Sequence, residues 1–139
     1  MMKISTLPAL IFLMTVFSFA ACAQTDADPS GEWRLVAYGA SASPTPAIPG
    51  VETSISFSSD GKFGGNVGCN SLGGEYKINS DGIHFDSIFS TMMFCEQTSE
   101  QESAVINILS GKTLTFSISG DQMTLVSKDG LAVIKLSRK

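Results

Sequence analysis

Four tight-turn dipeptides separate a series of short segments in which apolar and polar residues alternate, and this pattern constrains the fold most. The dipeptides are Asp60-Gly61, Asp81-Gly82, Gly120-Asp121 and Asp129-Gly130. Such pairs supply the positive φ angles that β-hairpin turns need. Strands joined by tight hairpins are antiparallel, and the alternation places apolar side chains on one face of each strand. The sequence therefore predicts a mainly β domain with an antiparallel sheet.

The alternation predicts seven or eight short strands. Their apolar positions are Trp33, Leu35 and Ala37; Ile55 and Phe57; Phe63, Gly65 and Val67; Tyr76 and Ile78; Ile83 and Phe85; Leu114, Phe116 and Ile118; Met123 and Leu125; and the run from Leu131 to Leu136. An antiparallel sheet of this size loses its exposed edges when it curls and closes. We therefore expect a curled meander that closes, or nearly closes, into a small barrel.

Two segments interrupt the alternation. Residues 40–50, ASASPTPAIPG, carry three prolines, which exclude the segment from the centre of a sheet and indicate a surface loop. Residues 98–109 are the best helix candidate, with Thr98 or Ser99 as the cap and Gln101 or Glu102 completing a capping box. The apolar stripe of this helix consists of Ala104, Val105, Ile108 and Leu109, and Gly111 follows as a stop. We expect the helix to cover one end or side of the barrel.

The N-terminal residues predict export. Residues 1–21 place Lys3 before an apolar stretch and small residues, as in a signal peptide, although an uncleaved anchor helix is an alternative. The sequence FAAC, ending at Cys22, resembles the bacterial lipobox, with Phe19 where an aliphatic residue is usual. We therefore expect a lipoprotein signal peptide over 1–21, a lipid on Cys22, a polar tether over 22–30 and a folded domain over 31–139. Ordinary cleavage after Ala23 is the alternative.

Charge limits the possible partners. Without Lys3, the chain has eight basic residues against 13 acidic ones, and no basic stripe. This balance argues against nucleic acids and anionic lipid headgroups as partners. By resemblance to lipoprotein sorting rules, the absence of aspartate after Cys22 favours the outer membrane, with the domain facing the periplasm. A soluble periplasmic or secreted protein is the alternative location.

The segment GGNVGCNSLGGEY at 64–76 concentrates glycines around one thiol. A P-loop would need a lysine and a following helix, but no lysine is present and Tyr76 resumes a strand pattern. A nucleophile elbow would also enter a helix. We therefore predict a sharp corner between strands. At this corner Asn70 and the glycines would adopt left-handed angles, and the glycines would let another segment approach closely.

The three cysteines favour a disulfide. In an exported protein, lipidation of Cys22 would leave Cys69 and Cys95 to pair, stabilising the domain by about 3–4 kcal/mol. The alternative is a cysteine-dependent hydrolase in which His84 activates Cys69 and Asp86 orients His84. We expect His84 to point to solvent, which argues against that chemistry. A single histidine and no C-x₂-C motif argue against zinc, and nothing indicates another cofactor.

The remaining acidic and apolar residues favour structural roles. The aspartates fall mostly in turns, and Glu100 and Glu102 belong to the start of the helix, so no pair of carboxylates suggests glycosidase chemistry. A second group is apolar and clusters before Cys95: Phe85, Phe89, Met92, Met93 and Phe94. We expect these side chains to pack in the core under the helix. The alternative is that they line a cavity for a small hydrophobic ligand.

Several motifs together resemble the META domain, or HslJ-like, family of bacterial envelope proteins. They are GEWRLVAY at 31–38, GCNSLGGEY at 68–76, STMMFCEQ at 90–97, Glu102, and the segment from 108 to 136. The motif positions include Gly68, Asn70, Gly74, Tyr76, Thr91 and Met93. Met92 departs from the family, which often has a basic residue there. The resemblance implies a β-rich, lipocalin-like barrel with one packed helix and a disulfide between Cys69 and Cys95.

The resemblance also implies an exported protein or lipoprotein, with links to heat shock, motility and envelope stress, and it supplies no catalytic residues. We therefore expect a non-enzymatic, lipid-anchored periplasmic module that binds another envelope protein in envelope stress or surface assembly. Carriage of a small hydrophobic ligand inside the barrel is the alternative function. The hydrolase with Cys69 and His84 is the second alternative.

Overall fold

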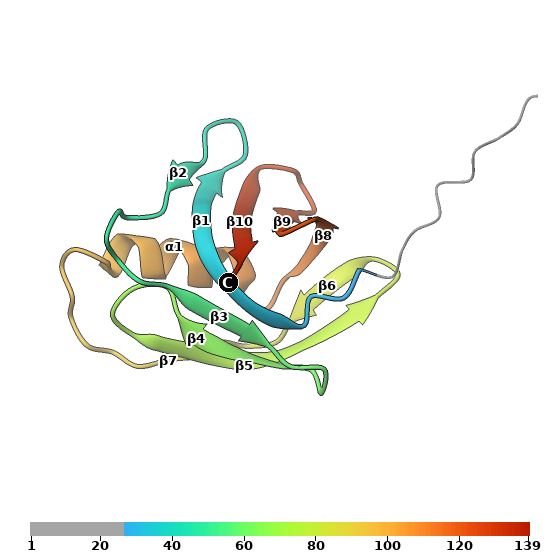
Figure 1. The fold of residues 1–139 in the computed structure, drawn as a ribbon, viewed down its shortest axis with the longest axis horizontal. Helices are drawn as coiled ribbons and strands as arrows, with labels where there is room; N and C mark the ends of the chain where they lie inside the picture. The colour runs from blue at the N-terminus through green and yellow to red at the C-terminus, as the bar shows by residue number, and fades with distance from the viewer. Residues whose placement is uncertain (1–26) are drawn as a thin grey trace, which may run out of the picture.

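Antiparallel strands close into a barrel beside one helix in the computed structural model, which describes residues 27–139 (Figure 1). The elements are β1 (Gly31–Ala40), β2 (Thr45–Pro46), β3 (Ser54–Phe57), β4 (Lys62–Asn66), β5 (Ser71–Asn79), β6 (Gly82–Phe85), β7 (Phe89–Ser90), α1 (Ser99–Leu109), β8 (Thr113–Ser119), β9 (Gln122–Ser127) and β10 (Ala132–Arg138). Eight strands follow in the order β10-β9-β8-β6-β5-β4-β3-β1, and β1 also pairs with β10. The predicted fold class is confirmed, and the barrel is closed.

The predicted hairpins join neighbouring strands. Gly61 has φ +85° between β3 and β4, in the left-handed region that glycine adopts without strain. Gly82, the first residue of β6 after the turn from β5, has φ +131°, and a Cβ there would collide with the Leu114 carbonyl of β8. Glycine at position 82 therefore serves both the turn and the close approach of the next strand in the barrel wall.

The short strands β2 and β7 lie outside the main order. β2 pairs two residues of the proline-rich segment with β1, at an edge of the sheet, as the exclusion of proline from central strands requires. β7 extends the β6 side of β5, with Phe89 opposite Gly73. Both additions widen the wall locally without changing the order of the eight strands.

The strict alternation that we predicted for the first strand is wrong beyond Leu35. The pairing of β1 with β10 shifts register between Leu35 and Ala37, as at a β-bulge. The extra residue changes which side chains point inward, so Tyr38 is buried in place of Ala37. Two further predicted inward residues, Ile78 and Leu131, are exposed. Leu131 lies before the start of β10, beside the Asp129-Gly130 turn.

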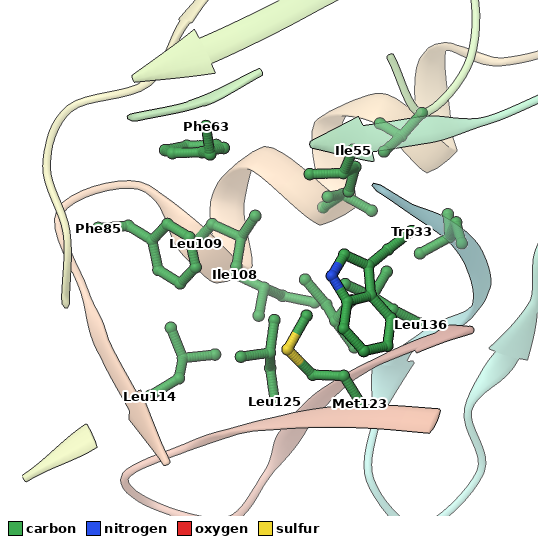
Figure 2. Packing of buried hydrophobic residues seen from close by; sticks show 14 of the residues in the cluster. Trp33, Ile55, Phe63, Phe85, Ile108, Leu109, Leu114, Met123, Leu125 and Leu136 are labelled. Atoms are coloured by element: carbon green, nitrogen blue, oxygen red, sulfur yellow. The ribbon is translucent and has the colours of Figure 1, made fainter. Parts of the chain in front are cut away.

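Side chains fill the inside of the barrel (Figure 2). Trp33, Phe85, Leu114, Met123 and Leu136 are fully buried there. Phe63 and Phe85 meet edge to face with ring centroids 5.1 Å apart, whereas Phe57 and Phe63 are stacked. The interior is therefore a packed hydrophobic core.

Helix α1 covers the end of the barrel where β4, β6 and β9 finish. Its side chains Val105, Ile108 and Leu109 are buried in the core, as its apolar stripe predicts. At that end of the barrel, Gln101 Nε2 donates to the carbonyl of Val67 at 2.6 Å, and Ser110 Oγ accepts from the N–H of Ile88. The prediction of a helix that covers the barrel is confirmed.

The predicted capping box is wrong. Thr98 is the N-cap, but its side chain makes no capping hydrogen bond. The Thr98 hydroxyl instead donates to the Glu102 carboxylate at 2.8 Å. Gln101 and Glu102 are both buried, because they lie one turn before Val105 and its neighbours on the same side of the helix.

The opposite end of the barrel is covered by the segment that leads into β1. Trp33 Nε1 donates to the Pro29 carbonyl at 2.8 Å, and the Arg138 guanidinium lies 4.2 Å from the centre of the Trp33 ring. Arg138 also donates to the Ser30 carbonyl at 3.0 Å. The chain thus enters the barrel at the end opposite α1.

Within residues 27–139, no helix has the length and apolar character that crossing a bilayer requires. The predicted signal peptide, Cys22 and the first part of the predicted tether fall in residues 1–26, outside the described residues.

Candidate functional site

The Glu102 carboxylate is the centre of a buried polar cluster between α1 and the β4–β5 connection. Only 6% of this residue is exposed. Its Oε1 accepts hydrogen bonds from the N–H of Cys69, from the N–H of Asn70 at 3.1 Å and from the Thr98 hydroxyl. Its Oε2 accepts from Asn70 Nδ2 at 2.7 Å. One helical side chain thus satisfies two backbone N–H groups of the glycine-rich corner.

These contacts set the charge of Glu102. Burial raises the pKa of the carboxyl, but the hydrogen bonds donated by Asn70, Cys69 and Thr98 outweigh it, so the pKa lies below its ordinary value. The group is therefore ionised at neutral pH, and its oxygens are occupied as acceptors. This arrangement suits a structural anion better than a general acid, which needs a raised pKa.

Asn70 ties the corner to the segment before α1. Its Oδ1 accepts from the Thr91 hydroxyl and from the N–H of Met93, both at 2.8 Å. Its Nδ2 donates to the Met93 carbonyl at 2.9 Å as well as to Glu102. The amide side chain thereby uses both of its donors and both acceptor positions.

Our prediction of a left-handed angle at Asn70 is wrong, since no described non-glycine residue has positive φ. The hydrogen bonds of the side-chain amide, and not the backbone angle, explain why asparagine suits position 70.

A disulfide joins Cys69 to Cys95, with the two Cα atoms 6.3 Å apart. The predicted pairing is confirmed. Cys69 Sγ is bonded to Cys95 and carries no thiol in this structure. His84 contacts Thr113 Oγ1 at 2.9 Å through Nδ1 and Asp86 at 3.4 Å through Nε2, and its side chain is partly exposed. Asp86 thus lies beside His84 as we expected for the hydrolase alternative, but Cys69 is engaged elsewhere.

Glycine at position 68 allows the helix to approach this corner. A Cβ on Gly68 would lie 2.8 Å from Thr98 Cβ and still closer to the Glu102 carboxylate. The structure thus gathers Gly68, Asn70, Thr91 and Met93 around Glu102. The other two motif positions lie further along β5: Gly74 packs against Phe63, and the Tyr76 hydroxyl donates to the Ser58 carbonyl at 2.7 Å.

The sequence model of the META domain family matches residues 26–139. The chain belongs to the META domain family. A search of curated proteins found no match.

Three solved structures share the fold of this META domain. An NMR structure of a protein from Burkholderia xenovorans has a TM-score of 0.64 and 24% identity, covering 79% of this chain and 82% of that one. The crystal structure of a DUF4847 family protein from Bacteroides vulgatus has a TM-score of 0.59 and 14% identity, covering 79% and 93%. Another NMR structure has a TM-score of 0.55 and 20% identity, covering 76% and 87%. At these identities the likeness concerns the fold alone.

The META domain exposes four large apolar side chains just before the disulfide. The exposed fractions are 69% for Phe89, 96% for Met92, 60% for Met93 and 85% for Phe94. Our prediction that these residues pack in the core is wrong, and only Phe85 of that group is buried. The strands already fill the interior, and Asn70 holds the Met93 backbone outside the barrel. We call Phe89, Met92, Met93 and Phe94 the apolar ridge.

A groove of about 690 Å³ adjoins the ridge. It is lined by Lys62, Phe63, Gly74, Glu75, Asp86, Ser87 and Phe89. Phe89 therefore belongs to both the ridge and the groove. Within the described residues, no group of three or more His, Cys, Asp or Glu side chains is placed to hold a metal ion.

Proposed function

We propose that this META domain is a non-enzymatic interaction module of the bacterial envelope, anchored by a lipid on Cys22, and that the apolar ridge is its contact surface. The observation that carries the proposal is the exposure of the ridge on a backbone held by Asn70 and by the disulfide. Large apolar side chains gathered on a surface typically mark a site of protein association.

The ridge is suited to binding because its backbone is fixed before the partner arrives. Thr91 pairs with Ser71 through backbone and side-chain hydrogen bonds, Met93 is held by Asn70, and Cys95 is held by Cys69. A preorganised segment loses little further entropy on association. Full burial of each exposed side chain would contribute roughly 1.5–3 kcal/mol, and methionine adapts to irregular partner surfaces.

Two observations support the envelope as the location. A disulfide persists in an oxidising compartment such as the periplasm, and the N-terminal residues read as a lipoprotein signal. The described chain begins at the end of the barrel opposite α1, whereas the ridge lies at the α1 end. A lipid anchor would then leave the ridge directed away from its own membrane, toward a partner in the periplasm.

The packed interior favours binding at the surface over carriage of a ligand inside the barrel. Buried side chains from the strands and from α1 occupy that space. The disulfide likewise favours a structural role for Cys69 over a nucleophilic one. Participation in envelope stress or surface assembly is the context that the family resemblance suggests for such a module.

Site-specific photocrosslinking in living bacteria tests the contact surface. A photoreactive residue at Met92 should form a discrete adduct with one protein. The same residue at Ile78, which is half-exposed at the end opposite α1, should not. The double change Met93→Ser and Phe94→Ser should abolish the adduct while leaving thermal stability unchanged, since both side chains are exposed. Absence of an adduct from Met92, or identical adducts from both positions, would overturn the proposal.

A further inference from the structure

Two aromatic side chains line the groove beside the ridge. Phe63 is almost fully buried and contributes the part of its ring beside Gly74, whereas the ring of Phe89 is largely exposed. A Cβ on Gly74 would lie 3.1 Å from the Phe63 ring and 3.2 Å from the Ser87 carbonyl, so glycine keeps this space open. The volume falls in the range of sites that receive a small molecule or a partner side chain.

The charged groups of the groove are unbalanced toward acid. Two carboxylates, Glu75 and Asp86, line it against one ammonium, Lys62. Lys62 lies 4.0 Å from Asp60, although it is opposite Glu75 in the β4–β5 register. Within residues 27–139, no ion pair within 4.0 Å joins Glu75 to a basic group. The groove therefore presents one carboxylate, that of Glu75, which forms no ion pair within 4.0 Å although Lys62 lies on the neighbouring strand.

The ion-pair partners of Asp86 can be replaced by another cation. Its carboxylate lies 3.7 Å from Lys77 Nζ and 3.4 Å from His84 Nε2, and Lys77 is largely exposed. Exposed pairs of this kind contribute about 0–1 kcal/mol, so an arriving cation can replace Lys77.

The chain segment around the ridge and the groove also has a negative net charge. Residues 78–111 carry the ridge and the groove residues Asp86, Ser87 and Phe89, and they contain no lysine or arginine. Of the five acidic residues in this segment, Asp81 is paired with Lys128 and Glu102 is buried, which leaves Asp86, Glu96 and Glu100. A second copy of the chain would bring like charges together, and an anionic bilayer would be repelled. Complementarity therefore selects a cationic polypeptide as the occupant.

On the basis of the function proposed above, we propose that the groove binds a lysine or arginine side chain of the polypeptide that docks on the apolar ridge. The aliphatic stem of that side chain lies along Phe63 and Phe89. Its cation lies over the exposed face of Phe89 and within reach of Glu75 and Asp86, which combines cation–π attraction with charge pairing. Phe89 joins the two surfaces, so the ridge takes the apolar residues of the partner and the groove takes its cation.

Peptide titration of the ¹⁵N-labelled protein tests this inference. The probe is a nine-residue peptide of alternating leucine and lysine, and the matched control peptide carries glutamate in place of lysine. The lysine peptide should shift the amide signals of Gly74, Glu75, Ser87 and Phe89, and the glutamate peptide should not. The double variant Glu75→Gln, Asp86→Asn should weaken binding by about tenfold. Both changes are isosteric and lie at exposed or half-exposed positions, and an unchanged spectrum of the free protein verifies the fold.

The matched control is Glu96→Gln, Glu100→Gln, which removes two exposed acids outside the groove and should leave the affinity within about twofold. Equal binding of the glutamate peptide, no shifts in the groove, or an unaffected double variant would overturn the inference. If the Met92 adduct forms while the groove binds no lysine peptide, the interaction module stands and the groove inference fails. If Met92 forms no adduct, the proposed function fails whatever the groove binds.

Discussion

Glu102 shows how much one residue organises in this domain. Its carboxylate joins helix α1, the backbone of Cys69 and Asn70, and through Asn70 the segment that carries the ridge. Hydrogen bonds to charged groups contribute about 1.5–3 kcal/mol each, and a buried donor left without a partner costs about 1–3 kcal/mol. Position 102 is thus a structural anion whose contacts hold the candidate binding surface in place.

Replacing Glu102 by glutamine should lower the free energy of unfolding at pH 7 by about 1–3 kcal/mol, because an amide group would face donors and leave at least one unpaired. The folded pKa of Glu102 lies below its unfolded value. Its contribution is therefore complete above the unfolded pKa of about 4.3 and is lost as pH falls through the lower folded pKa. Urea unfolding measures this dependence: the difference in free energy of unfolding between wild type and Glu102→Gln should be smaller at pH 3 than at pH 7.

Glu100→Gln is the control, since Glu100 is exposed on the same helix. It should change the free energy of unfolding by less than about 0.5 kcal/mol at either pH. If the difference in free energy of unfolding between wild type and Glu102→Gln is the same at pH 7 and pH 3, the assigned role of the ionised carboxylate is contradicted.

At the scale of elements, the disulfide ties the β4–β5 connection to the residue that follows the ridge. The bond spans 26 positions in sequence. Because Asn70 and Glu102 hold the same region, the disulfide adds a covalent restraint to a corner that is already hydrogen-bonded. We therefore expect the ridge to loosen, and the barrel to keep its fold, when the bond is absent.

The double variant Cys69→Ser, Cys95→Ser should lose about 3–4 kcal/mol of stability, because the unfolded chain regains the entropy of an open loop. Thermal unfolding measures this loss, and amide hydrogen exchange at Thr91 to Cys95 should speed up more than exchange in β9 and β10. Reductant should lower the melting temperature of the wild type toward that of the variant. A variant as stable as the oxidised wild type would show that the bond does not stabilise the fold.

At the scale of the whole molecule, the two ends of the barrel differ. Helix α1, the polar cluster and the ridge occupy one end, while Trp33, Arg138 and the entering chain cover the other. The ridge and the first described residues of the chain therefore lie at opposite ends of the barrel.

Cys22→Ser should move the protein from the membrane fraction to the soluble fraction, because the proposed lipid attaches to the Cys22 thiol. The mass of the N-terminal peptide from the wild type should correspond to a lipidated Cys22. Ala23→Ser, which keeps the thiol, should remain in the membrane fraction. A mature peptide that starts at Gln24 would instead establish ordinary cleavage, and an uncleaved N-terminus would establish an anchor helix.

The architecture was predictable because its determinants are local. Alternation and turn dipeptides such as Asp60-Gly61 act over a few residues, and so does the stripe of α1. The disulfide was predictable once Cys22 was assigned to the lipid, which left Cys69 and Cys95, and the family resemblance implied the same pair. The burial of Gln101 and Glu102 was also predictable, since they lie on the same side of the helix as Val105 and Ile108. Their polar character led us to assign them to the cap.

The sequence by itself determined the antiparallel strands and the helix, because both depend on short-range patterns, and it indicated the disulfide because assigning Cys22 to the lipid left two thiols. Only the tertiary structure decided the exposure of the ridge and the contacts of Glu102 with Cys69 and Asn70, which are more than 30 positions away. Burial depends on the volume already filled by other strands, and a contact depends on which distant groups remain unpaired. A local sequence pattern predicts neither the burial of a side chain nor its contacts with distant groups. The candidate binding surface could therefore be identified only from the tertiary structure.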